Sequence, residues 1–347
     1  MSKISYDQFL LLVRNPNSDL EEIKQYLLIE PGEGGFSFKL RPDPDKVELS
    51  LDDLSQENAM AIGNWASRLR RRELFNHRKK HFPEMPVIVS EGDSWFQFPL
   101  LIKDTVDGLL NSYNVWSVGA AGDTAQNMIL TSQTPKKAEY MKALLEQKEN
   151  VEAFLLSAAG NDILGEDPIT KRPVMLDLIL PFDGKTKKPS DHVNHKLLTE
   201  KLNFLSNAYS TVVNTIRAES SFETLPIVIH GYDYAFPWPE GASDPRKPRY
   251  AKKDQWLGSA FSQRGYPTDF PRREIIKYLV DRLYDLMANL SGNSKESHVW
   301  LVDCRGALPT VKHWNDEIHG TSSGFKDVAA RFDSVIKKAV ANRQAGN

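Results

Sequence analysis

Five residues with the chemistry of serine catalysis each follow an apolar run, at a point where a strand would end. Ser94 comes after the first run, and Gly122 and Asn161 come after the next two. Asp316 and His319 stand three residues apart, beyond the last run. A serine hydroxyl is a weak nucleophile and needs a base, usually a histidine whose tautomer is fixed by a carboxylate. These residue types therefore suit acyl transfer through a serine nucleophile.

The order of these residues gives each one a possible position in a reaction. In a tight turn, Asp316 could reach Nδ1 of His319 while Nε2 of that ring faces Ser94. The developing oxyanion also needs hydrogen-bond donors, for which the backbone N–H of Gly122 and the side-chain amide of Asn161 are candidates. Gly122 lacks a Cβ, so its backbone can approach a reacting carbonyl. Gly-Asp-Ser and Asp-x-x-His are each common by chance, and it is their occurrence together that favours catalysis.

Apolar runs alternate with amphipathic segments from residue 86 onward, and they predict the elements that position these residues. Strands are expected at residues 87–90, 114–119, 151–157, 226–230 and 298–304. Helices are expected at residues 125–130, 136–149, 196–217, 272–290 and 323–341. Strands separated by helices of this length predict a parallel sheet with helices on both faces. The ligand crevice of such a sheet lies at the carboxyl ends of its strands.

The polar blocks at the strand ends, taken together, resemble the SGNH/GDSL hydrolase superfamily from about residue 86 to the C-terminus. The blocks are Gly92-Asp93-Ser94, Gly122-Asp123-Thr124, Gly160-Asn161-Asp162 and Asp316-Glu317-Ile318-His319. The resemblance implies a flavodoxin-like three-layer α/β/α fold with about five parallel strands. It also implies cofactor-free and metal-independent hydrolysis of carboxyl esters or related acyl bonds. The substrate would be a small-molecule, lipid or carbohydrate acyl ester.

The resemblance also implies roles for the matching positions. Ser94 would be the nucleophile and the first oxyanion donor. Gly122 would add its backbone N–H and Asn161 its side-chain amide to the same oxyanion hole. His319 would be the general base and Asp316 its partner, so we expect activity to fall when His319 becomes protonated.

Two positions depart from the family pattern, and two long connections surround the expected site. Trp95 stands where leucine is usual and Gly320 where proline is common, which bears more on the substrate than on the mechanism. Trp95 and His230, which ends the fourth predicted strand, are candidate substrate-binding residues, although a structural histidine is the simpler interpretation of His230. Insertions are expected at about residues 164–195 and 233–271. The second insertion is rich in aromatic residues and is predicted to form a lid or pocket wall.

Residues 1–84 lie outside the resemblance, and we expect them to form a small, mostly helical extension of unknown role on a catalytic domain of residues 85–347. Helices are expected at residues 6–13, 20–28 and 54–81, with a short strand at 36–40. The third helix carries a basic run, which comprises Arg68, Arg70, Arg71, Arg72, Arg78, Lys79 and Lys80. A solvated helix face is the simpler interpretation of this run. A docking surface for an acidic partner or nucleic acid is the alternative.

Composition narrows the class of protein. The 347 residues carry a formal net charge of -2, so the overall charge does not favour nucleic acid or an anionic membrane. No apolar stretch is long enough to span a bilayer. The single cysteine, Cys304, is expected to be a buried thiol, and the lack of a signal-peptide pattern predicts a cytoplasmic protein. His192 and His195 lack a third ligand nearby in the sequence and the i,i+4 spacing of common zinc helices, so no metal is expected.

Three hypotheses are compatible with these patterns. The first is a serine esterase, whose acyl and leaving groups and oligomeric state the sequence leaves open. The second is an acyltransferase or carbohydrate deacetylase with the same site, suggested by the aromatic residues of 233–271 that could stack on sugar rings. The third is a non-enzymatic interaction protein that acts through the basic helix. The complete set of catalytic groups argues against the third.

Overall fold

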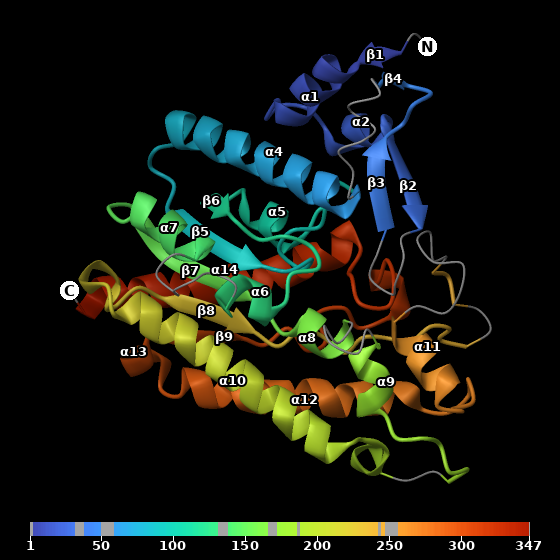
Figure 1. Cartoon of the computed structure of the whole chain (residues 1–347). Helices are drawn as coiled ribbons and strands as arrows, with labels where there is room; N and C mark the ends of the chain where they lie inside the picture. The colour runs from blue at the N-terminus through green and yellow to red at the C-terminus, as the bar shows by residue number, and fades with distance from the viewer. Residues whose placement is uncertain are drawn as a thin grey trace.

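A five-stranded parallel sheet lies at the centre of the molecule (Figure 1). The computed structural model describes residues 3–31, 38–49, 59–130, 138–165, 172–185, 188–241, 244–246 and 256–346. The strands of the sheet are β5 (Val87–Gly92), β6 (Asn114–Ser117), β7 (Val151–Ser157), β8 (Ile227–His230) and β9 (Val299–Val302). They pair in the order β6-β5-β7-β8-β9, which is the strand order of flavodoxin-like sheets. All five predicted strands are confirmed.

The strands form where apolar runs can be covered from both sides. Every residue of β5, β6 and β8 is buried, as is typical of a parallel sheet between two helical layers. β5 extends two residues beyond the predicted end, so the strand runs to within one residue of Asp93-Ser94. The sheet thus carries the serine to its carboxyl edge.

Helices cover both faces of the sheet and complete the predicted three-layer α/β/α fold (Figure 1). α5 (Thr105–Leu109) and α14 (Ser322–Gly346) pack together on one face. α10 (His195–Arg217) and α12 (Arg272–Ser291) pack together on the other face. The shorter α6 (Ala125–Leu130) and α7 (Glu139–Glu146) connect β6 to β7. Not one helix of the described ranges has the length and apolar character that crossing a bilayer requires.

The N-terminal segment contains more β-structure than expected. Its helices are α1 (Tyr6–Arg14), α2 (Leu20–Lys24) and α4 (Ala59–His81). Its strands are the antiparallel pair β2 (Leu27–Pro31) and β3 (Phe38–Pro42) and the short parallel pair β1 (Ile4–Ser5) and β4 (Val47–Glu48). Residues 50–58, where the third helix was expected to begin, lie outside the described residues.

The predicted helix over residues 20–28 is wrong in its second half. Asp19 caps the helix, with its side chain accepting a hydrogen bond from the N–H of Glu21, but the helix ends at Lys24. The chain then enters β2, where Ile29 pairs with the buried Leu40 of β3. Pairing with a distant strand overrides the local helical spacing, as tertiary contacts often do.

α4 uses its basic residues to attach to the rest of the chain. The side chain of Arg71 is only 7% exposed. Its guanidinium donates to the carboxylate of Asp104 at 2.6 Å and to the backbone carbonyl of Phe96 at 2.8 Å. The interpretation as a solvated helix face is therefore wrong for Arg71. A surface helix would leave such a guanidinium in water, whereas burial requires it to be paired.

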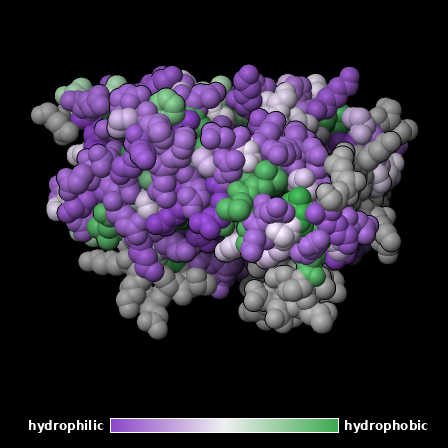
Figure 2. Space-filling view, turned by 90° about the horizontal axis from the view of Figure 1, so that it is seen from above, coloured by the Kyte–Doolittle hydropathy of each residue, from purple (hydrophilic) through white to green (hydrophobic). Residues whose placement is uncertain are grey.

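Other members of the basic run also have partners within the chain. Arg70 donates to the backbone carbonyls of Asn15 and Ser18, Arg68 pairs with Glu139, and Arg72 stacks over Trp116. Figure 2 shows the side of the molecule that carries α1 and α4, and it is mostly hydrophilic with small, separated apolar areas. The division of the chain near residue 84 stays a prediction.

Candidate active site

The structure brings Ser94, His319 and Asp316 into one hydrogen-bonded chain at the carboxyl edge of the sheet. Ser94 Oγ lies 2.7 Å from Nε2 of His319, although 225 residues separate them. Nδ1 of His319 lies 2.9 Å from each carboxylate oxygen of Asp316. All three residues are buried. This is the geometry by which a carboxylate orients a histidine to take a proton from a serine hydroxyl.

The carboxylate of Asp316 also folds the turn that carries its own histidine. Its Oδ1 accepts the backbone N–H groups of Ile318 at 2.9 Å and His319 at 2.8 Å. Such local capping by an aspartate is a standard way to stabilise a turn. Burial alone would raise the pKa of Asp316, but the neighbouring His319 and the two N–H donors outweigh it and lower that pKa. The group facing the imidazole is therefore an ionised acceptor at neutral pH.

Two aromatic rings enclose His319. The ring of Phe98 lies 4.8 Å from the imidazole centroid to centroid, at an interplanar angle of 74°. The indole of Trp256 lies 5.7 Å away, at 83°. Phe98 was not singled out in the sequence, because nothing local marks a phenylalanine beyond the serine turn as a neighbour of a histidine near the C-terminus. Both rings restrict how the imidazole can turn.

Asn161 lies beside Ser94 in the wall of a pocket, on α8 (Gly160–Leu164). Its Nδ2 donates to the carbonyl of Asp123 at 2.7 Å, which leaves the second hydrogen of the amide for a ligand. Gly122, directly before Asp123, has φ 86°, a conformation that favours glycine. The two predicted oxyanion donors thus lie on segments tied to each other. The role of Gly122 stays a prediction.

Asp162 makes a second hydrogen bond between α8 and the segment that contains Gly122. Its Oδ2 accepts the backbone N–H of Ala125 at 2.7 Å, at the start of α6. Asp162 therefore caps the start of α6 from a different segment of the chain. The residue before α8, Ala159, has φ 103°, which is rare for a residue with a side chain and is strained. Strain next to Asn161 is consistent with a backbone held in place for function.

Trp95 lines the pocket, as expected of a substrate-binding candidate. Its indole N–H donates to the carbonyl of Ile318 at 2.9 Å, which joins the serine turn to the histidine loop. His230 does not reach the pocket: it is fully buried, with Nε2 2.8 Å from Oγ of Ser157. The prediction of His230 as a substrate-binding residue is therefore wrong. Burial lowers the pKa of His230 to about 3, so its ring is neutral.

A buried hydrogen-bond network around Asp93 and Tyr232 holds the turn that carries Ser94. Asp93 accepts hydrogen bonds from Oγ of Ser157 at 2.9 Å and from the hydroxyl of Tyr232 at 2.5 Å. The Tyr232 oxygen in turn accepts the N–H of Gly160 at 2.9 Å. Since Asp93 precedes Ser94 and Gly160 precedes Asn161, the Tyr232 hydroxyl connects the predicted nucleophile to the predicted oxyanion donor. Burial raises the pKa of Asp93, and the hydrogen bonds to Tyr232, Trp95 and Ser157 oppose that shift.

Removal of this hydroxyl should slow catalysis. We expect Tyr232→Phe to lower kcat for an ester substrate by about tenfold to a hundredfold, because an unpaired buried group costs about 1–3 kcal/mol. KM should change little, since the hydroxyl acts on the serine turn and α8. Steady-state kinetics of the purified variant measure both.

Tyr234→Phe is a matched control, because the Tyr234 hydroxyl donates to Asp281 outside the network. The control should keep the wild-type kcat. If kcat of Tyr232→Phe equals that of the control, the hydroxyl does not position the site.

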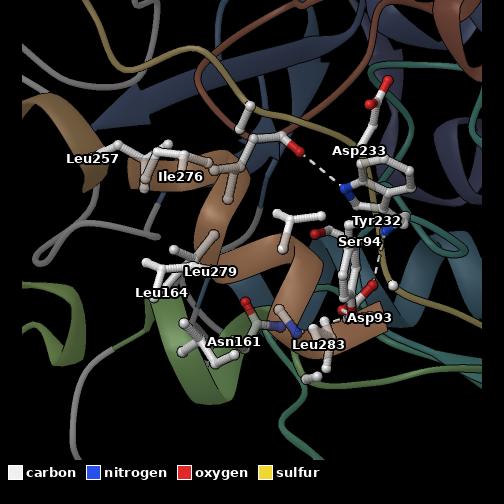
Figure 3. Close-up of a pocket in the computed structure, with 18 of the residues that line it drawn as sticks. Asp93, Ser94, Asn161, Leu164, Tyr232, Asp233, Leu257, Ile276, Leu279 and Leu283 are labelled. Carbon is white, nitrogen blue, oxygen red and sulfur yellow. Dashed lines mark hydrogen bonds between the residues drawn. The ribbon is translucent and has the colours of Figure 1, made fainter. Parts of the chain in front are cut away.

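The pocket beside Ser94 has a mostly apolar wall, as Figure 3 shows. Aliphatic side chains predominate, and Trp95, Tyr232 and Trp314 contribute aromatic rings. α12 contributes Ile276, Leu279, Val280 and Leu283, whose spacing places them on one face of the helix. Further apolar residues come from three other segments, namely Ile163, Leu164, Leu257 and Ile318. The polar groups at the pocket gather at one end, around Ser94 and Asn161. This arrangement suits a molecule with one reactive polar group and an apolar chain.

The prediction that residues 233–271 form a pocket wall is confirmed, but not with aromatic side chains. Asp233, Ala235 and Leu257 line the pocket, the last from α11 (Trp256–Gln263). Phe236 instead carries the guanidinium of Arg273 on its face, and Trp256 packs on His319. Tyr250 lies outside the described residues.

Cys304, His192 and His195, which the sequence also raised as candidates, are not among the described residues that line the pocket. Cys304 is buried as expected, and burial raises the pKa of its thiol. His192 is buried with Nδ1 3.0 Å from the Tyr266 hydroxyl, and His195 begins α10. Within the ranges that the structure describes, no three His, Cys, Asp or Glu side chains gather as a metal ion would need.

No protein-family model matches this chain, and no curated protein does. Among solved structures, the chain is similar to an extracellular lipase from Streptomyces rimosus, with 12% identity over 72% of this chain and 99% of that chain and a TM-score of 0.44. It is also similar to phospholipase A1 from Streptomyces albidoflavus, with 14% identity, the same coverage of 72% and 99%, and a TM-score of 0.43. These likenesses are distant, so the chemistry of the site has to be argued from its own geometry.

Proposed function

We propose that this chain is a serine hydrolase that cleaves a carboxyl ester through an acyl-enzyme on Ser94. The observation that carries the proposal is the continuous hydrogen-bonded chain from Ser94 Oγ through His319 to Asp316 at the carboxyl edge of the sheet. In this order, an imidazole held by an ionised carboxylate can take the proton of the hydroxyl and later give it to a leaving group, while the carboxylate stays ionised.

The reaction would proceed in two halves. Nε2 of His319 takes the hydroxyl proton while Ser94 Oγ attacks the carbonyl carbon, and the imidazolium that forms is stabilised by Asp316. The oxyanion receives hydrogen bonds from the proposed donors, the N–H groups of Ser94 and Gly122 and the amide of Asn161. His319 then gives its proton to the leaving alcohol. Water, activated by the same histidine, releases the acid and restores Ser94.

The pocket wall favours an apolar acyl group. The four α12 residues span Ile276 to Leu283, which is about 10 Å of helix and matches a medium-length acyl chain. None of the described aromatic side chains of residues 233–271 lines this pocket: Phe236 packs on Arg273, and Trp256 packs on His319. Hydrolysis of a hydrophobic acyl ester is therefore preferred over carbohydrate deacetylation. The expectation of a cytoplasmic protein stays a prediction.

A series of p-nitrophenyl esters tests the proposal. We expect kcat/KM to rise from acetate to octanoate as the chain fills the pocket, because each buried methylene contributes about 0.8 kcal/mol. Mass spectrometry with and without an added alcohol distinguishes hydrolysis from transfer to that alcohol. A pure preparation that cleaves no ester of the series, or cleaves only acetylated sugars, would contradict the proposal.

Narrowing the pocket should shift the preference toward short chains. Leu279 is buried in the pocket wall, so we expect Leu279→Phe to lower kcat/KM for the octanoate ester about tenfold or more while the acetate ester is unaffected. Leu290→Phe, near the end of the same helix and away from the pocket, is the control. An equal loss on both esters would show that the acyl chain binds elsewhere.

A further inference from the structure

Glu317 is a buried carboxylate inside the histidine loop that the proposed reaction does not use. It is 0% exposed and lies between Asp316 and Ile318. Its Oε1 accepts the backbone N–H of Trp238 at 2.5 Å and that of Gly258 at 2.6 Å. Its Oε2 accepts the N–H of Leu257 at 2.8 Å. The two consecutive acidic residues thus have different partners: Asp316 contacts the ring of His319, and Glu317 accepts hydrogen bonds from the backbone of Trp238 and of the first turn of α11.

The segment that Glu317 holds is the first turn of α11. This turn contacts His319 and also forms part of the wall of the apolar pocket. Trp256 packs its ring edge-on against His319. Leu257 lines the apolar pocket. Any shift of this turn would change the surroundings of the base and the shape of the pocket together.

The contact between α11 and the loop before it is as close as a glycine permits. A Cβ on Gly258 would lie 1.9 Å from the carbonyl oxygen of Trp238, far inside van der Waals contact. The Glu317 carboxylate lies against the same place, 3.1 Å from that Cβ position. Trp238, Gly258 and Glu317 therefore meet in one close contact, which we call the α11 joint and which attaches α11 to the histidine loop.

Arg246 forms a second connection between the same parts. Its NH1 donates to the carbonyl of Phe236 at 2.8 Å and to that of Asp316 at 3.3 Å. Its NH2 pairs with Asp244 at 2.6 Å, so the buried guanidinium is neutralised. The backbone at Phe236 and Trp238 and the first turn of α11 are thus attached to the histidine loop, through Glu317 and through Arg246.

We propose that Glu317 is a positioning residue that holds the first turn of α11 on the histidine loop, and thereby sets the orientation of His319 and the preference for long acyl chains. This inference rests on the proposed ester hydrolysis. It assigns to a middle position of the Asp-x-x-His block a role that the spacing alone does not suggest.

Glu317→Gln tests the joint with almost no change in size. A carboxamide offers a single acceptor oxygen and turns an N–H group toward the backbone donors, so at least one of the three hydrogen bonds is lost. Gly258→Ala disturbs the same joint from the other side. Glu240→Gln is the matched control, because Glu240 is an exposed residue of the same segment.

The measurements are the kcat/KM ratio of octanoate to acetate esters and the hydrogen exchange of backbone amides. We expect Glu317→Gln and Gly258→Ala to lower the ratio about tenfold and to lower kcat on acetate. The amides of Trp238, Leu257 and Gly258 should exchange about tenfold faster, because an unpaired buried donor costs about 1–3 kcal/mol. Amides of β7 should exchange as in the wild type, and Glu240→Gln should change none of these values.

A proportional loss on both esters, with an unchanged ratio, would overturn the inference and leave Glu317 a stability residue. Unchanged exchange at Leu257 and Gly258 in Glu317→Gln would overturn it as well. If the wild type cleaves no ester, the proposed function fails, and the exchange measurement still decides whether Glu317 holds the joint.

Discussion

Replacing Ser94 with alanine is expected to lower kcat for p-nitrophenyl octanoate by about 10⁶-fold, the order of loss seen when a triad nucleophile is removed. The Ser94 hydroxyl is the only protein group in the proposed mechanism that bonds to the acyl carbon. His319 and Asp316 have no nucleophile to activate without it. The fold should be unaffected, because the change removes one oxygen at the edge of the sheet. Purified wild type and variant are compared by product release and thermal melting.

Ser90→Ala is the matched control for this experiment. Ser90 lies four residues earlier on β5, is fully buried, and its hydroxyl has no hydrogen-bond partner in the part of the chain that the structure describes. The control should keep the wild-type rate. If Ser94→Ala retained more than about a hundredth of that rate, the nucleophile would have to be another group.

Asp316→Asn is expected to lower kcat by about 10⁴-fold with little change in KM, as such a replacement does in other triads. The amide can turn its NH2 group toward Nδ1 of His319, which favours the tautomer whose Nε2 carries the proton and cannot accept one from Ser94. It also removes the charge that stabilises the imidazolium. Asp285→Asn, on an exposed part of α12, is the control, since its side chain is 58% exposed. A loss below tenfold would contradict the proposed role of Asp316.

The pH dependence follows from the same contact. The pKa of Asp316 is lowered in the folded protein, so its ionisation stabilises the fold above the unfolded pKa of an aspartate, and this stability is lost as the pH falls through the lower, folded pKa. Asp316 therefore stays ionised well below neutral pH, and its own protonation should not limit activity there. We expect the acidic side of the kcat/KM profile to show the uptake of a single proton.

Much of the sheet could be predicted because its signal is local. β5 and β8 are buried on both faces, and each begins with three consecutive apolar residues, Val87 to Val89 and Ile227 to Ile229, which mark the strands in the sequence. The proposed triad could be found because Ser94 follows the end of such a run, and because Asp316 and His319 stand at Asp-x-x-His spacing in the loop after the last strand. The rule fixes which edge a residue reaches but not the direction of its side chain. His230 ends β8 as predicted and still turns into the core, toward Ser157.

Contacts between distant segments leave no such signal. The Tyr232 hydroxyl meets Asp93 across 139 residues, and Glu317 meets Trp238 across 79. A buried ion pair such as Arg71 with Asp104 looks like a charged helix face in the sequence, because its partner is 33 residues away. The residues that support the site, rather than those that react, are therefore the ones that required the structure.

The most direct test of the central claim is to trap the acyl-enzyme. The wild type is mixed with p-nitrophenyl octanoate, quenched in acid within the first turnovers, digested and measured by mass spectrometry. We predict an octanoyl group on the peptide that contains Ser94, located on Ser94 by fragmentation and absent from Ser94→Ala. Release of p-nitrophenol with the acyl group on another residue, or ester cleavage by Ser94→Ala at the wild-type rate, would contradict the account.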